Sequence, residues 1–95
     1  MNNLILDFLH RLPTSYSGIR AVILFGSFLG NKTYRDVDVI LVFDNPDEIL
    51  ATRSIVRAFK DRFSLDLHIQ LFFAEDAKNL EGFLDKAGNW ELLYG

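Results

Sequence analysis

The chain has 95 residues, of which 49% are hydrophobic, and this length predicts one domain spanning residues 1–95 around a single modest core. The formal net charge of −3 argues against a nucleic-acid-binding module, which normally carries a basic face. The chain has no cysteine, which excludes a disulfide, a thiolate metal site and a cysteine nucleophile, and fits a reducing compartment.

The N-terminal stretch does not read as a targeting segment. Asp7, His10 and Arg11 interrupt its apolar residues, so a signal peptide is not expected. No apolar run approaches the ~18–20 residues of a membrane span. We therefore expect a soluble, cytoplasmic protein.

The first half of the chain predicts one helix and two strands. Five apolar residues follow the spacing of a helix face, namely Leu4, Ile5, Phe8, Leu9 and Leu12. Pro13 predicts the end of that helix. Branched and aromatic residues predict strands over Ile19–Phe25 and Asp36–Phe43. The second strand is almost continuously apolar after its two acids, which predicts burial on both faces.

The second half predicts two helices around a third strand. Asn45 and Pro46 match an N-cap and a first helical residue. The helix that follows is expected to bury a stripe made of Ile49, Thr52, Val56, Phe59 and Phe63. Residues 65–73 predict a strand, residues 74–87 a helix ended by Gly88, and residues 89–95 a short strand or a docked tail. This alternation predicts an α/β (α+β) fold with helices packed on a small sheet.

Two aspartates stand where the second strand begins. Residues i and i+2 of a strand share a face, so Asp36 and Asp38 project side by side with Cα atoms roughly 7 Å apart. Carboxylates this close repel each other, and a divalent cation offsets the repulsion. Mg²⁺ prefers such oxygen ligands, and two ions ~3.5–4 Å apart suit in-line phosphoryl chemistry. The alternative is a pair of strand-entry acids in water.

A third acid, Asp66, opens the third strand. If this strand pairs beside Asp36–Phe43, Asp66 can reach the same pocket, complete a metal site and accept a proton from an attacking hydroxyl. Its alternative role is to cap a turn. His68 should share the face of Asp66, where it orients an acid, touches a base or serves as a satisfied strand histidine.

Gly26 and Ser27 close the first strand. Glycine permits a tight turn and the close approach of a phosphate to the backbone. Free N–H groups at a helix start attract anions, and the Ser27 hydroxyl adds a donor. With two acids ten residues further on, this pair predicts a phosphate-binding turn.

At this point the sequence resembles the DNA polymerase beta-like nucleotidyltransferase superfamily, and its size resembles the minimal, MNT-type branch. The matching segments are Phe25-Gly26-Ser27, Asp36-Val37-Asp38-Val39 and Leu65-Asp66-Leu67. The resemblance implies a small mixed sheet flanked by helices. It implies that Gly26 and Ser27 hold nucleotide phosphates, that Asp36 and Asp38 bind Mg²⁺, and that Asp66 joins this metal site and activates an acceptor hydroxyl.

The resemblance also implies a reaction and a partner. A nucleoside monophosphate, AMP from ATP, would pass to a hydroxyl, with release of pyrophosphate. Minimal members often pair with HEPN-domain toxins as antitoxins, and homodimerisation also suits so small a core. Nothing in the sequence points to nucleic acid or membrane as a partner.

The Gly-Ser turn departs from the family pattern G-S-x-A-R-G. The arginine is missing, the spacer is about two residues short, and Arg35 replaces the serine before the first acid. Lys32 or Arg35 supplies the lost positive charge to a nucleotide, or is a solvated loop cation. These departures support an alternative function, a catalytically weak or inactive binding module that regulates its partner by contact.

Overall fold

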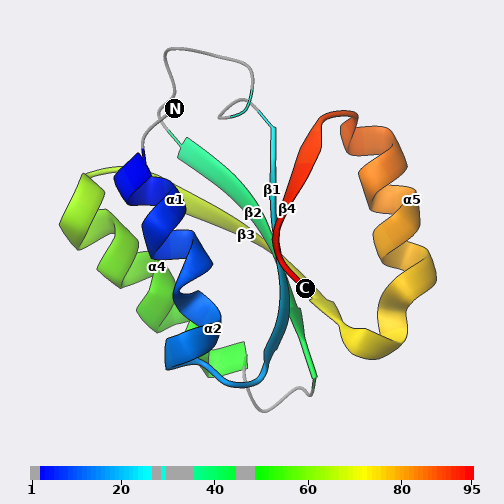
Figure 1. Ribbon diagram of the computed structural model, residues 1–95, viewed down its shortest axis with the longest axis horizontal. Helices are drawn as coiled ribbons and strands as arrows, with labels where there is room; N and C mark the ends of the chain where they lie inside the picture. Colours follow the sequence, from blue (N-terminus) through cyan, green and yellow to red (C-terminus); the bar gives the residue numbers. More distant parts are fainter. Residues whose placement is uncertain (1–2, 27–28, 30–35, 45–48) are drawn as a thin grey trace.

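A computed structural model describes residues 3–26, 29, 36–44 and 49–95 and shows a mixed sheet with helices on both faces (Figure 1). The described elements follow one another as α1 (Asn3–His10), α2 (Leu12–Ser15), β1 (Ile19–Phe25), β2 (Asp36–Phe43), α4 (Ile49–Phe63), β3 (Asp66–Phe73), the 3-10 helix η2 (Ala74–Asp76), α5 (Ala77–Ala87) and β4 (Trp90–Tyr94). The predicted fold class, a small mixed sheet flanked by helices, is confirmed.

The four strands lie in the order β3-β2-β1-β4. β1 pairs antiparallel with β2 and with β4, whereas β2 pairs parallel with β3. Parallel neighbours need a crossover connection, and α4 lies in the segment between β2 and β3. The starts of β2 and β3 therefore lie beside the end of β1, at one end of the sheet.

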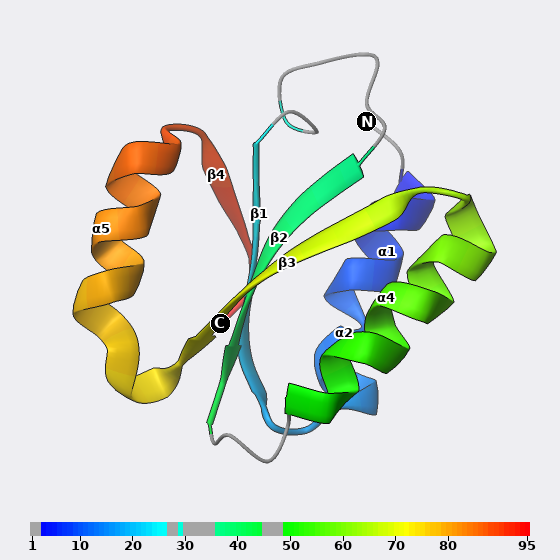
Figure 2. The ribbon, with the colours of Figure 1, turned by 180° about the vertical axis from the view of Figure 1, so that it is seen from behind.

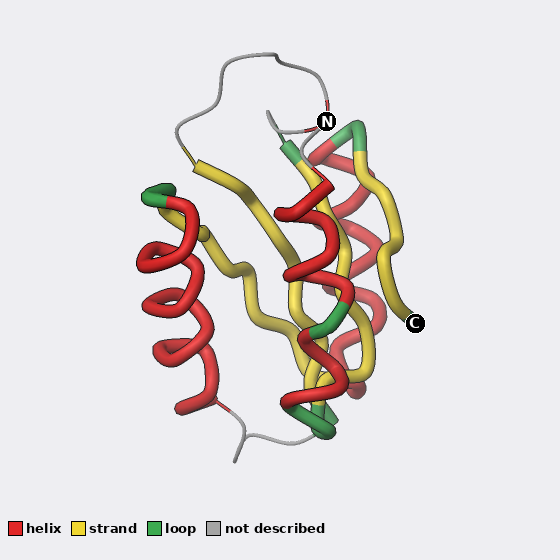
Figure 3. Tube along the Cα trace, turned by 60° about the vertical axis from the view of Figure 1, so that its left-hand side comes forward, coloured by secondary structure: helices red, strands yellow, loops and turns green. Residues whose placement is uncertain are grey.

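The sheet separates two apolar layers. Helices α1, α2 and α4 cover one face and α5 covers the other, as the reverse view also shows (Figure 2). Side chains of β2 alternate between the layers, with Val37 and Val39 facing the larger core and Ile40 and Val42 the smaller. A third view shows the strands between helices on either side (Figure 3). The predicted two-sided burial of β2 is confirmed.

The helices agree with the prediction in one detail and differ from it in another. Pro13 lies beyond the end of α1, as predicted, and stands in the first turn of the separate short helix α2, where a missing N–H costs no helical hydrogen bond. In α4, Ile55 and Phe59 are buried, whereas Val56 is 36% and Ile49 42% exposed. The predicted stripe was therefore displaced by one residue at Val56, because two adjacent apolar residues leave the helix phase undecided.

The C-terminal segment forms a strand, which decides between the two predicted alternatives. β4 pairs with β1, and Phe25 lies opposite Trp90. On the face of the sheet that α5 covers, the Phe83 ring of α5 packs edge-on against Phe25 at 5.2 Å and against Phe72 at 5.7 Å between centroids.

Among the described helices, none combines the length and apolar character needed to cross a membrane.

Candidate metal centre

The strand order brings the sequence-predicted acids to one end of the sheet. Asp36 and Asp38 are the first and third residues of β2, and Val37 between them is fully buried on the opposite face. Asp38 lies opposite Phe25 of β1 on one side and His68 of β3 on the other. The predicted shared face of the two aspartates is what places both carboxylates beside the same histidine.

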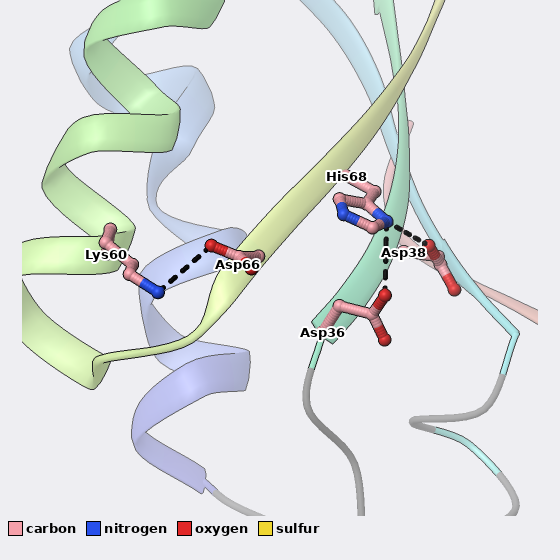
Figure 4. A network of polar contacts seen from close by, with 5 residues as sticks. All are labelled: Asp36, Asp38, Lys60, Asp66 and His68. Carbon is pink, nitrogen blue, oxygen red and sulfur yellow. Dashed lines mark hydrogen bonds and ion pairs between the residues drawn. The ribbon is translucent and has the colours of Figure 1, made fainter.

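His68 lies between the two carboxylates (Figure 4). Its Nδ1 atom is 3.2 Å from Oδ2 of Asp36 and 3.5 Å from Oδ1 of Asp38. Each of these three side chains offers one donor atom, and the three atoms lie within 4.8 Å of one another. Of the alternatives that the sequence left open for His68, contact with the acids is the one that the structure shows.

Asp66 lies elsewhere, although the backbone brings it close. It is the direct partner of Asp36 in the parallel register. Its carboxylate, however, lies 3.1 Å from Nζ of Lys60 in the last turns of α4 (Figure 4). The structure thus brings Asp36, Asp38 and His68 together and leaves the Asp66 side chain with Lys60. A catalytic or metal-binding role for Asp66 stays a prediction.

The two aspartates differ in burial. The side chain of Asp38 is 26% exposed, against 39% for Asp36. Burial raises the pKa of Asp38, the negative charge of Asp36 raises it further, and His68 opposes both effects. Two carboxylates whose charges repel in a partly desolvated site favour a cation or a hydrogen-bond donor between them.

Gly26 forms a close-fitting wall beside this site. Its φ of +81° lies in the region that side chains rarely adopt, and a Cβ atom there would stand 2.6 Å from Oδ2 of Asp38. Glycine is therefore required for the carboxylate to occupy its position. The predicted contact of Gly26 with a phosphate stays a prediction, and Ser27, Lys32 and Arg35 lie outside the described residues.

The donor set fits a divalent cation. Two carboxylates supply the hard oxygen ligands that Mg²⁺ and Mn²⁺ take, and the absence of a Cβ at Gly26 leaves room for Asp38 to turn inward. Asp36, Asp38 and His68 are the residues that would hold such an ion. All three remain partly exposed, so the site is open to solvent and to a second molecule.

A groove of about 600 Å³ lies between α4 and β3, on the side of Asp66 that faces Lys60. Apolar side chains and basic side chains both line it, including Val56, Ile69, Leu71, Arg53 and Arg57. Asp66 lines this groove, whereas Asp36, Asp38 and His68 do not. The carboxylate pair therefore lies outside this groove.

Comparison with known proteins rests on structure. No protein-family model matches the sequence, and no curated protein matches it significantly. A mutant of the MntA–HpeT toxin–antitoxin has a TM-score of 0.64 at 16% identity, over 100% of this chain and 74% of that chain. A toxin–antitoxin with AMP-PNP has a TM-score of 0.62 at 18% identity, over 98% and 72%.

A third similar structure comes from Shewanella oneidensis. A tri-AMPylated Shewanella oneidensis HEPN toxin in complex with MNT antitoxin has a TM-score of 0.58 at 18% identity, over 98% of this chain and 68% of that chain. At these identities the likeness concerns the fold. The mixed sheet, the position of the paired aspartates on it and these three matches lead to one conclusion: the chain has the MNT-type nucleotidyltransferase fold.

Proposed function

We propose that this protein is a Mg²⁺-dependent nucleotidyltransferase that transfers AMP from ATP to a hydroxyl group of a partner protein, as the cytoplasmic antitoxin of a toxin–antitoxin pair. The observation that carries the proposal is the pair Asp36 and Asp38, side by side at the open start of β2 in an MNT-type fold. The AMPylated HEPN toxin and the AMP-PNP complex among the structural neighbours support the choice of nucleotide and partner.

Each residue has a definite part in the proposed reaction. Asp36 and Asp38 hold the metal ion, which when bound neutralises phosphate charge and draws the reactants together. Gly26 and Ser27 position the phosphates. The acceptor oxygen bonds to the α-phosphorus, the bond from that phosphorus to the bridging oxygen breaks, and pyrophosphate leaves. Asp66 receives the hydroxyl proton after its carboxylate leaves Lys60. The ion pair between Lys60 and Asp66 is exposed and contributes only about 0–1 kcal/mol, so separating the two side chains costs little.

The acceptor side of the reaction falls to a second protein. The carboxylate pair lies at an open end of the sheet, and the groove near it runs between α4 and β3 instead. We expect that the second protein presents the acceptor hydroxyl to the carboxylate pair. A HEPN-type toxin is the partner that the neighbouring complex suggests.

The experiment combines purified protein, a HEPN-type partner, Mg²⁺ and ATP labelled on its α-phosphate. We expect label on the partner with the wild type and none with Asp36→Asn or Asp38→Asn. Asp44→Asn is the matched control, because Asp44 follows the other end of the same strand and its carboxylate pairs with Arg20 at the surface. Label transfer that survives both site variants would exclude this mechanism.

A binding module that acts by contact is the second candidate. The observation that favours it is Asp66, whose carboxylate pairs with Lys60 while His68 stands between the other two acids. A contact-only regulator predicts that neutralisation of the partner persists in Asp36→Asn and Asp38→Asn, with no label transferred by the wild type. An enzyme predicts that neutralisation and label transfer are lost together.

A further inference from the structure

We propose that His68, and not Asp66, is the third protein ligand of the cation at Asp36 and Asp38, so that the site favours a nitrogen-accepting transition ion such as Mn²⁺ over Mg²⁺. This inference rests on the proposed function only in taking the site to be a metal centre. It names the residue on β3 that completes the centre and the class of ion that follows.

The distances carry the first step. Donor atoms about 2.1 Å from one six-coordinate ion lie about 3 Å apart when they occupy adjacent positions. Nδ1 of His68 lies 3.2 Å from Oδ2 of Asp36 and 3.5 Å from Oδ1 of Asp38, so small side-chain rotations suffice to turn all three toward one ion. Asp66 is not a member of this group, because its carboxylate lies beside Lys60.

The strand pairing carries the second step. His68 is the direct partner of Asp38 in the parallel register, and residues i and i+2 share a face, so Asp36, Asp38 and His68 come from one surface of two hydrogen-bonded strands. All three residues stand on paired strands and none on a loop, so no loop has to move to bring them together. The ligand positions are therefore set by the sheet itself.

Charge carries the third step. Asp36 and Asp38 repel each other, because residues i and i+2 of β2 place the two carboxylates on one face. A third carboxylate would add to that repulsion, whereas a neutral imidazole adds a ligand without adding negative charge. His68 thereby completes a site that Asp66 could complete only at greater electrostatic cost.

The ligand types decide the ion. Imidazole nitrogen suits Zn²⁺, Fe²⁺ and other transition ions, whereas Mg²⁺ prefers oxygen ligands. Two carboxylates and one imidazole form a mixed set, and Mn²⁺ accepts both kinds of donor. A mixed set predicts that the preference for Mn²⁺ over Mg²⁺ depends on His68.

The test uses the full chain with Mn²⁺ alone and pulsed electron paramagnetic resonance, which detects ¹⁴N nuclei bound to the ion. We expect a nitrogen coupling in the wild type that disappears in His68→Ala, with Mn²⁺ affinity lower by about tenfold or more. Asp66→Ala should keep the coupling and most of the affinity. His10→Ala, on the exposed side of α1, is the histidine control and should leave both unchanged.

The inference would be overturned by Mn²⁺ bound without nitrogen coupling, by a coupling that persists in His68→Ala, or by a loss of affinity in Asp66→Ala but not in His68→Ala. Failure of Mn²⁺ to bind at millimolar concentration would overturn it as well. The label-transfer assay tests the proposed function independently of this experiment, since transfer from ATP with Mg²⁺ can succeed whichever residue of β3 binds Mn²⁺. Circular dichroism of the metal-free variants shows whether each one folds.

Discussion

Gly26→Ala tests whether the Asp38 carboxylate needs the space that the missing Cβ of Gly26 leaves free. An added Cβ meets Oδ2 of Asp38 at 2.6 Å, so that carboxylate must move. The backbone φ of +81° adds strain of about 1–2 kcal/mol for a residue with a side chain. For a domain of this size each kcal/mol lowers the melting temperature by roughly 4–8 °C, which gives a fall of roughly 4–16 °C.

The control separates backbone strain from the steric clash. Gly88 has a nearly identical φ of +82°, but a Cβ there meets nothing within 4 Å. Gly88→Ala should therefore lose stability through backbone strain alone, while leaving the carboxylates undisturbed. Thermal unfolding followed by circular dichroism, with and without Mn²⁺, measures both effects in one series.

The metal-dependent stabilisation gives the decisive comparison. A ligand present at 100 times its dissociation constant stabilises the folded state by about 2.7 kcal/mol. We expect this gain in the wild type and in Gly88→Ala, and its loss in Gly26→Ala. A Gly26→Ala protein that gains as much stability from Mn²⁺ as the wild type would refute the argument that the carboxylate needs the space beside Gly26.

Three further predictions follow from burial, charge and helix geometry. Because burial raises the pKa of Asp38 in the folded state, stability falls as pH rises from the ordinary carboxyl pKa to the raised one, so metal-free Asp38→Asn should melt higher than wild type at pH 7. The difference should vanish below pH ~4, and a lower melting point for the variant at pH 7 would contradict this sign. Phe59→Ala removes a fully buried ring that packs against Phe8 at 5.4 Å, and urea denaturation should show a loss of about 3–5 kcal/mol, whereas a loss below ~1 kcal/mol would show that the core closes over the gap. Gly82→Ala, at an exposed position of α5 with free space for a Cβ, should raise stability by about 1 kcal/mol in the same assay, and a decrease would mean that α5 bends there.

The local sequence pattern was sufficient to predict strands β1 and β2 and the shared face of the two aspartates. The bounds of β1 and β2 agree with the predicted segments, because runs of branched and aromatic residues are a strong strand signal. Alternation along a strand also places Asp36 and Asp38 on one face without reference to any tertiary contact. The phase of α4 was less certain, and Val56 was assigned to the core where Ile55 belongs.

The identity of the third group beside the aspartates was decided only in three dimensions. Asp66 and His68 share a face of β3, so sequence periodicity treats them alike. Two non-local contacts separate them: Lys60 on α4 lies against the Asp66 carboxylate, and the parallel register places His68 beside Asp38. The fit of Gly26 against Asp38 is likewise a contact between strands. A sequence states which side chains repeat along one strand, whereas pairing between strands determines which of them meet.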